Sequence, residues 1–208
     1  MEANNNTMLT GQETFSLNGE KMGFNVLDFW RFQYSNLSDL EGRVGEFLVA
    51  MALGKESGDN NNGFTLWDID YGGKRIEVKT TTYYKPYRKE GTYSNVRVFG
   101  ISQAYPNKDN SAQCYSKEKD HSIKIRNNDI YVFVINIGKT KEDADPLNLN
   151  NWRFYVVATK RINDECGNNK TISLQKVQKI SSHPNGLMFD ELKTEVDQLI
   201  KKLNDPDK

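Results

Sequence analysis

The chain contains few of the residues that mark several protein classes. Only two of its 208 residues are cysteines, Cys114 and Cys166, which lie far apart and form no CxxC pattern. They give no support to a disulfide framework or a zinc site, and they fit a reducing cytoplasm. The two histidines, His121 and His183, have no second ligand at metal-binding spacing. We therefore expect both histidines at the surface.

Long hydrophobic runs and an excess of one charge are also missing. No apolar stretch approaches the roughly 20 residues that span a bilayer, and the first residues lack the pattern of a secretory signal. Basic and acidic residues number 28 each, so phosphate binding would need a local patch. Gly-x-Ser-x-Gly and Gly-rich phosphate-binding motifs are absent. We expect a soluble, cytoplasmic protein without an organic cofactor.

What the sequence does contain is a strong β-hairpin pattern at residues 66–79, LWDIDYGGKRIEVK. Gly72-Gly73 is a two-residue turn signal, and pairing across it sorts the flanking side chains onto two faces. The apolar face would consist of Trp67, Ile69, Ile76 and Val78. The charged face would consist of Asp68, Asp70, Arg75, Glu77 and Lys79.

The charged face of this hairpin suggests chemistry. Asp70 opposite Arg75 would be an ordinary ion pair, but Asp68 opposite Glu77 would place like charges together, which destabilises a sheet. Such a pair persists if a cation lies between the carboxylates or one of them stays protonated. Mg²⁺ is held by one or two carboxylates plus substrate phosphates. Lys79 points to the same side, so the pattern predicts metal-dependent phosphate chemistry.

A helix is predicted before the hairpin, from a capping box at 38–41 to a stop at Gly54. It is apolar nearly all round, so we expect it to be largely buried; its main stripe is Leu40, Val44, Phe47, Leu48 and Met51. Glu41 serves the cap, whereas Glu46 is the only ionisable residue in Val44–Gly54. A buried carboxylate needs a partner or a metal. We predict Glu46 as the helix member of the site, with Glu41 as the alternative; a salt bridge to Arg43 or a solvent-facing edge would explain Glu46 structurally.

Asp68 followed by Glu77-Val78-Lys79 resembles the signature of the PD-(D/E)xK nuclease superfamily, which has the restriction-endonuclease-like fold. Residues 41–54 are similar to the helix with a further Glu that often precedes this signature. Trp67 stands where the motif often has a proline. The resemblance covers about residues 38–84 and depends on the order and spacing of short motifs.

The resemblance implies a Mg²⁺-dependent endonuclease acting on DNA and leaving a 5′-phosphate, with Mn²⁺ as a possible substitute. Asp68, Glu77 and the Val78 carbonyl would bind the metal, Glu46 would complete the shell directly or through water, and Lys79 would orient or help deprotonate the attacking water. A restriction or defence enzyme is the first expectation, and a structure-selective repair nuclease is the second. The alternatives are a catalytically inactive nucleic-acid-binding or assembly module on the same fold, or an unrelated α/β protein. Cutting both strands usually requires two active sites, which favours a homodimer.

A basic, tyrosine-rich run follows the hairpin. From Lys74 to Arg97 there are seven basic and two acidic residues, interleaved with tyrosines that can stack on bases. The predicted DNA contacts are Tyr84, Lys85, Tyr87, Arg88, Lys89 and Arg97. The alternative is a solvated hairpin tip, and residues 117–126 are a weaker candidate because their charges are mixed.

The remaining pattern predicts an α/β domain of restriction-endonuclease-like architecture, with a mixed central sheet of about five strands flanked by helices. Strands are expected at 64–71, 74–84, 95–103, 129–137 and 152–159, with an edge strand or a turn at 171–177. Residues 1–22 are expected to be flexible, and 23–208 to form one domain, in which a short aromatic helix at 24–34 packs on the core. An amphipathic helix at 189–203 should cover the sheet or form a dimer contact.

Overall fold

The computed structural model describes residues 9–34, 41–55, 65–85, 97–108 and 119–205. The chain divides into two compact units, Met1–Leu40 and Glu41–Lys208. The division therefore lies after Leu40, whereas the sequence suggested a boundary near residue 22. In the part of the chain that the structure describes, no helix has the length and apolar character needed to cross a membrane.

The first unit contains a β-hairpin and a short helix. Strands β1 (Thr14–Leu17) and β2 (Glu20–Asn25) pair antiparallel, and α1 (Val26–Gln33) follows β2 directly. The hairpin lies in the segment expected to be flexible. Its signal was present in the sequence: Asn18 and Gly19 both have positive φ, 53° and 86°, as an Asn-Gly hairpin turn requires.

Helix α1 begins with a reciprocal capping box. The Asn25 side chain accepts from the Asp28 backbone N–H at 3.0 Å, and the Asp28 carboxylate accepts from the Asn25 N–H at 3.0 Å. A helix was therefore correctly expected here, but its aromatic residues form no core within the described part of this unit. Phe24 and Phe29 are half-exposed and Phe32 is 84% exposed. The described part of this small unit therefore provides no core of its own for these rings, and packing of the helix on the core of the second unit stays a prediction.

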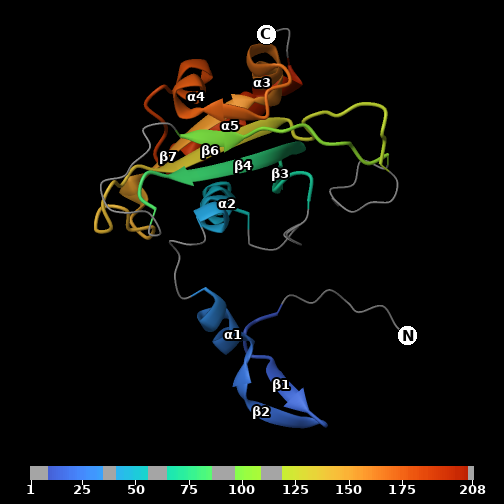
Figure 1. The fold of residues 1–208 in the computed structure, drawn as a ribbon, viewed down its shortest axis with the longest axis vertical. Helices are drawn as coiled ribbons and strands as arrows, with labels where there is room; N and C mark the ends of the chain where they lie inside the picture. Colours follow the sequence, from blue (N-terminus) through green and yellow to red (C-terminus); the bar gives the residue numbers. More distant parts are fainter. Residues whose placement is uncertain (1–8, 35–40, 56–64, 86–96, 109–118, 206–208) are drawn as a thin grey trace. The chain divides into compact units, whose positions relative to one another are not determined.

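The second unit is built on a four-stranded mixed sheet in the order β3-β4-β6-β7 (Figure 1). Its strands are β3 (Ile69–Tyr71), β4 (Lys74–Thr82), β6 (Ile130–Asn136) and β7 (Trp152–Ala158). Strands β4 and β6 are parallel, and the other two pairs are antiparallel. The predicted mixed sheet flanked by helices is confirmed, although it has four strands and not about five.

The missing fifth strand belongs to a separate ladder. Of the predicted strand at 95–103 the structure describes residues 97–103, and only β5 (Val98–Gly100) is a strand; it pairs with β8 (Thr171–Ser173) in a two-stranded sheet. The segment expected at 171–177 is thus a short strand that runs into α4 (Leu174–Ile180). The preceding helix α3 (Thr159–Cys166) was not predicted, because only Thr159, Ile162 and Cys166 are buried along it and the apolar pattern is weak.

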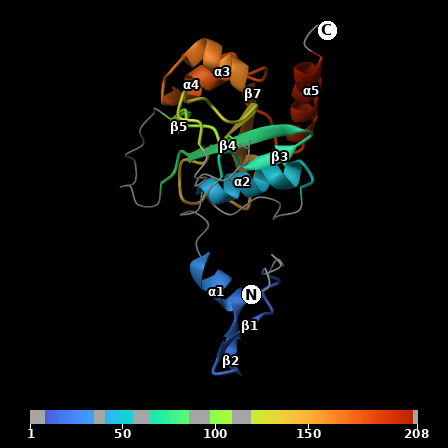
Figure 2. The same cartoon turned by 90° about the vertical axis from the view of Figure 1, so that its right-hand side faces the viewer.

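Hydrophobic cores cover both faces of the central sheet, and helices lie on either side of it (Figures 1 and 2). Helices α2 (Glu41–Ala52) and α5 (Leu192–Asn204) pack on one face, where Ile76, Val78 and Val132 belong to a single core cluster. Phe133, Ile135 and Val177 belong to the cluster on the other face, with α3 and α4. All of β6 is buried, as its continuous apolar run predicted. The expectation that the C-terminal helix covers the sheet is confirmed.

Strand β4 connects the fold to the candidate site. Ile76 and Val78 face the α2 side, and a Cβ at Gly45 of α2 would lie 1.9 Å from Thr80 Oγ1. Because side chains alternate along a strand, Arg75, Glu77 and Lys79 project from the opposite face. The polar row predicted from the sequence therefore forms on β4.

Candidate active site

The hairpin that carries the candidate site has the predicted register. Ile69 pairs with Ile76, Asp70 with Arg75 and Tyr71 with Lys74. Gly72 and Gly73 form the turn with φ of 58° and 73°, a region that favours glycine. Lys74 and Arg75 therefore begin β4 directly after the turn, and Glu77 and Lys79 follow at fixed positions.

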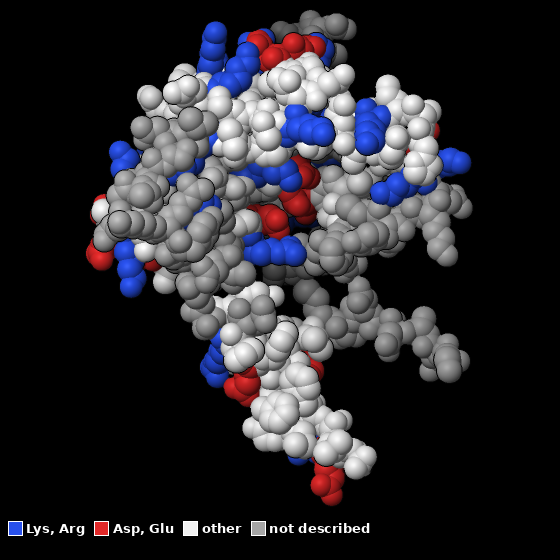
Figure 3. Space-filling model, in the orientation of Figure 1, with Lys and Arg blue, Asp and Glu red and all other residues white. Residues whose placement is uncertain are grey.

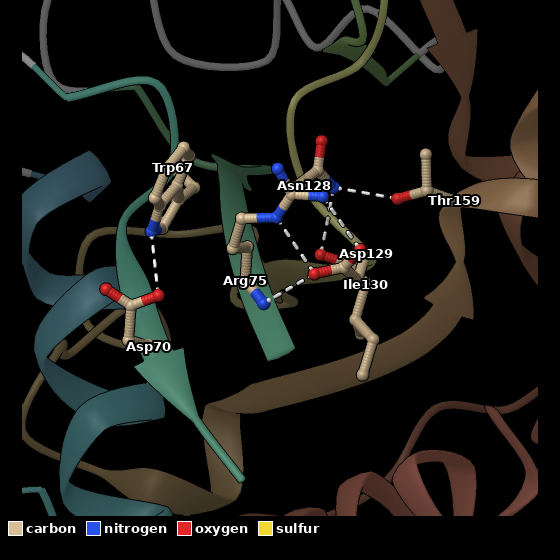
Figure 4. A network of polar contacts seen from close by, with 7 residues as sticks. All are labelled: Trp67, Asp70, Arg75, Asn128, Asp129, Ile130 and Thr159. Carbon is tan, nitrogen blue, oxygen red and sulfur yellow. Dashed lines mark hydrogen bonds and ion pairs between the residues drawn. The ribbon is translucent and has the colours of Figure 1, made fainter. Parts of the chain in front are cut away.

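The hairpin differs from the prediction at Trp67. Strand β3 begins only at Ile69, so the alternation of faces does not extend back to Trp67. The Trp67 indole donates to Asp70 Oδ1 at 2.9 Å, and the Arg75 guanidinium lies over the Trp67 ring at 5.3 Å (Figure 4). Trp67 is buried, but it lies against polar groups and outside the core cluster that contains Ile69. Its predicted place on the apolar face was wrong.

Arg75 has its main partner outside the hairpin. Its Nε and Nη2 donate to the two oxygens of Asp129 at 3.0 Å each, and its backbone N–H donates to Asp129 Oδ2 at 2.9 Å (Figure 4). Burial alone would raise the pKa of Asp129, but these hydrogen bonds outweigh it and lower that pKa below its ordinary value. The hairpin pattern contained no signal for Asp129, which comes just before β6.

Asp68 lies beside β4 although it precedes β3. Its backbone N–H donates to the Ile76 carbonyl at 3.0 Å, and its Oδ2 accepts from the Val78 backbone N–H at 2.7 Å. These two bonds place the Asp68 carboxylate next to the Glu77-Val78-Lys79 segment. The structure thus brings Asp68 close to Glu77, as the sequence predicted, through a backbone contact and not through a regular strand pair.

Glu77 and Lys79 form an ion pair through Glu77 Oε1 and Lys79 Nζ. The side chain of Glu77 is 16% exposed, whereas that of Lys79 is 35% exposed. Burial by itself would lower the pKa of Lys79, but Glu77, and then Asp68 and Glu46, outweigh it and raise that pKa. Lys79 is therefore held in its charged form.

Helix α2 contributes Glu46 to the same cluster. Arg43 Nη1 lies 3.1 Å from Glu46 Oε2, so the salt bridge that would explain Glu46 structurally is present. Glu46 also interacts electrostatically with Asp68 and Lys79. The helix is less buried than predicted, since Phe47 of the expected stripe is 54% exposed. The side chain of Glu41, the alternative, lies outside the described residues.

Burial disfavours the ionised forms of all three carboxylates, and the charge of Asp68 adds to this effect at Glu77 and Glu46. Burial, and then the Asp68 charge, raises the pKa of Glu77 to about 7. Burial and then Asp68 also raise the pKa of Glu46, and burial raises that of Asp68. In Figure 3, acidic side chains lie recessed between basic ones where β3, β4 and α2 run in Figure 1. Raised carboxylate pKa values in such a recess are typical of functional sites.

The carboxylate oxygens of Asp68, Glu77 and Glu46 are ligands of the kind that a hard divalent cation prefers. Among the described residues, no three or more His, Cys, Asp and Glu side chains form a ready-made metal cluster. Asp68 uses Oδ2 for the Val78 N–H and Glu77 uses Oε1 for Lys79, and their second oxygens have no hydrogen bond within the described parts of the chain. Oxygen ligands and surplus negative charge suit Mg²⁺ or Mn²⁺. A shared ion would require Asp68, Glu77 and Glu46 to rearrange.

The predicted nucleic-acid contacts have different outcomes. Arg97 is only 6% exposed, donates to the Tyr83 carbonyl at 2.8 Å and lies over the Tyr83 ring at 4.9 Å. It is a buried packing residue, so its assignment as a phosphate contact was wrong. Tyr84 and Lys85 are half-buried after β4. Tyr87, Arg88 and Lys89 lie outside the described residues.

Comparison with protein-family models, with curated proteins and with solved structures gave no match.

Proposed function

We propose that this protein is a divalent-metal-dependent endonuclease that hydrolyses phosphodiester bonds in DNA, on a restriction-endonuclease-like fold. The observation that carries the proposal is the grouping of Glu46, Asp68 and Glu77 around Lys79. Three carboxylates with raised pKa values are costly without a cation, and the arrangement has the residue types that metal-assisted phosphate chemistry needs.

In this proposal Asp68 and Glu77 hold Mg²⁺ or Mn²⁺ through their free oxygens, with the Val78 carbonyl as a further ligand. Glu46 would complete the shell directly or through water, and a bound ion would compete with the protons that the raised pKa values of Glu46 and Glu77 favour. The bound ion supplies Lewis acidity and lowers the pKa of a coordinated water.

In the metal-free cluster Lys79 is a cation. Burial alone would lower its pKa, but the charges of Glu77, Asp68 and Glu46 outweigh burial and raise that pKa. A lysine ammonium is a compact charge that binds phosphate oxygens. Lys79 therefore orients the attacking water and stabilises negative charge that develops on the phosphate.

The DNA and assembly roles belong to the same proposal. Tyr84, Lys85, Tyr87, Arg88 and Lys89 contact the substrate, and Arg97 supports this segment by fixing Tyr83. The first biological role to test is restriction or defence in the cytoplasm, and the second is structure-selective repair. A homodimer would supply two active sites for the cutting of both strands.

The test is a cleavage assay on supercoiled plasmid, linear duplex and branched DNA, with Mg²⁺, Mn²⁺ or EDTA. Asp68→Ala should abolish metal-dependent cutting, whereas the matched control Asp143→Ala, which removes an exposed carboxylate from a loop, should retain it. Absence of cutting on every substrate, with DNA binding intact, would support the inactive binding module. If the wild type neither cuts nor binds DNA, the proposal is wrong.

A further inference from the structure

A second polar site lies at the start of β4 and β6, beside the first turn of α3. It is a cavity of about 600 Å³, a size typical of small-molecule sites. Its charged lining is strongly basic and consists of Lys74, Arg75, Lys124, Arg126, Lys160 and Asp129. Five cations against one carboxylate, in a protein of zero net charge, mark this cavity as a place for an anion.

The one carboxylate does not cancel this charge. Asp129 is engaged by Arg75 at both oxygens (Figure 4), and Arg126 is fixed by bonds to the Ile101 carbonyl at 2.9 Å and Asn163 Oδ1 at 2.6 Å. Arg75 and Arg126 are therefore held in place by the protein and form part of the cavity lining. Within the described segments Lys74 makes no ion pair, although its charge acts on Asp129, and the Lys124 ammonium lies over the Tyr105 ring at 4.9 Å. Both lysines are available to a ligand.

Helix α3 adds to the positive potential. Its N-cap is Ala158, which offers no side-chain cap, and its first turn has no acidic residue. The Thr159 N–H donates to the Asp129 carbonyl, and Thr159 Oγ1 accepts from Asn128 at 2.9 Å (Figure 4). Thr159 and Lys160 of this first turn line the cavity. This supports anion binding but does not by itself establish it.

An apolar wall lies in the same cavity. Ile123 and Ile125 line it and are 62% and 37% exposed. Inorganic phosphate would make no use of such a wall, whereas the flat face of a base would bury it. A cavity lined by both cations and isoleucines therefore suits a ligand with both a phosphate and a nucleoside.

We propose that this cavity binds a nucleotide, with its phosphate at Lys74, Lys124 and the first turn of α3, and its nucleoside against Ile123 and Ile125. The ligand is a free nucleotide or the phosphorylated end of a DNA strand, which share this chemistry. Arg75 and Glu77 project from the same face of β4, two positions apart, so the cavity is next to the carboxylate cluster. The proposal does not depend on catalysis.

The test is calorimetric titration of the full chain in EDTA, which removes metal from the carboxylate cluster. The probes are dAMP, inorganic phosphate, and an eight-nucleotide single strand with a 5′-phosphate or a 5′-hydroxyl. The Lys74→Ala/Lys124→Ala variant should bind dAMP at least about tenfold more weakly, because it loses two charged contacts. The matched control Lys179→Ala, an exposed lysine on α4, should bind normally. Ile123→Ser should weaken dAMP but not phosphate.

The outcomes are separable from those of the cleavage assay. Asp68→Asn should leave dAMP binding unchanged even if it abolishes cutting. If the 5′-phosphorylated strand binds more tightly than dAMP, the ligand is a strand end. If dAMP binds more tightly than the strand, the ligand is a free nucleotide. Either result supports the proposal if the double-lysine variant loses that binding. Equal affinity for phosphate and dAMP, or loss of binding in Asp68→Asn but not in the double-lysine variant, would overturn it.

Discussion

At the scale of single residues, Glu77 makes the stability of the metal-free protein depend on pH. Its pKa is about 7 in the folded chain against an ordinary 4.5. An acid with a raised pKa binds more protons when folded, so its contribution to the free energy of unfolding is complete below pH 4.5 and is lost as the pH rises through 7. We expect a loss of roughly 3 kcal/mol at most across this window. Thermal unfolding in EDTA from pH 4.5 to 8 measures it, and Glu77→Gln should flatten the profile.

A divalent cation should reverse this trend. Mg²⁺ competes with the protons on Glu77, Asp68 and Glu46, so it should raise the unfolding midpoint more at pH 8 than at pH 5. The matched control is Glu142→Gln, an exposed residue far from these carboxylates in the sequence, which should keep the full response. A Mg²⁺ response that is identical at both pH values, or that survives Asp68→Asn, would count against metal binding by the cluster.

Substitution of Lys79 should affect cleavage of DNA but not its binding. Lys79→Ala removes the cation of the cluster while leaving the backbone bonds of β4 in place. We expect cleavage to fall by at least about 100-fold, the usual loss when a charge-stabilising group is removed, with DNA affinity and unfolding midpoint little changed. Single-turnover cleavage and filter binding measure the two effects. Unchanged cleavage would show that the role given to Lys79 is wrong.

At the scale of elements, the close approach of α2 to β4 depends on Gly45. A Cβ there would lie 1.9 Å from Thr80 Oγ1 and 2.9 Å from Thr80 Cβ. Gly45→Ala should therefore push the helix away, destabilise the protein by about 1–3 kcal/mol and reduce cleavage by displacing Glu46. The control is Gly42→Ala in the same helix, where a Cβ meets nothing within 4 Å; it should gain up to about 1 kcal/mol. Chemical denaturation of both variants measures the change in the free energy of unfolding.

The elements with strong periodic signals were predictable from the sequence. The Gly72-Gly73 turn fixed the register of β3 and β4, the apolar run at 130–136 identified a buried central strand, and the stripe of α5 identified a covering helix. Helix α3 was missed because it is short and its buried face consists of only three residues, Thr159, Ile162 and Cys166. The hairpin β1–β2 was missed because its side chains are polar or exposed, so only the turn marks it.

At the scale of the whole molecule, the same contrast holds for the two candidate sites. Asp68, Glu77, Lys79 and Glu46 are close in sequence or on one predicted helix, so local patterns could group them. The cavity joins residues from β4, the segment before β6 and α3, and no local pattern connects Lys74 with Lys124 or Thr159. Arg97 was misassigned for a related reason: its composition suggests a surface contact, but tertiary packing buries it.

The second unit should fold without the first. Both hydrophobic cores lie entirely within Glu41–Lys208, whereas Gly11 is the only buried residue in the described part of Met1–Leu40. A chain that lacks residues 1–34 but keeps Ser38, the predicted helix cap, should therefore unfold cooperatively with the midpoint of the full chain and bind dAMP equally well. The isolated segment 1–40 should show no cooperative transition, because it is too short to bury a core. A clear drop in the midpoint of the shortened chain, measured by thermal unfolding, would show that the cores depend on the first unit.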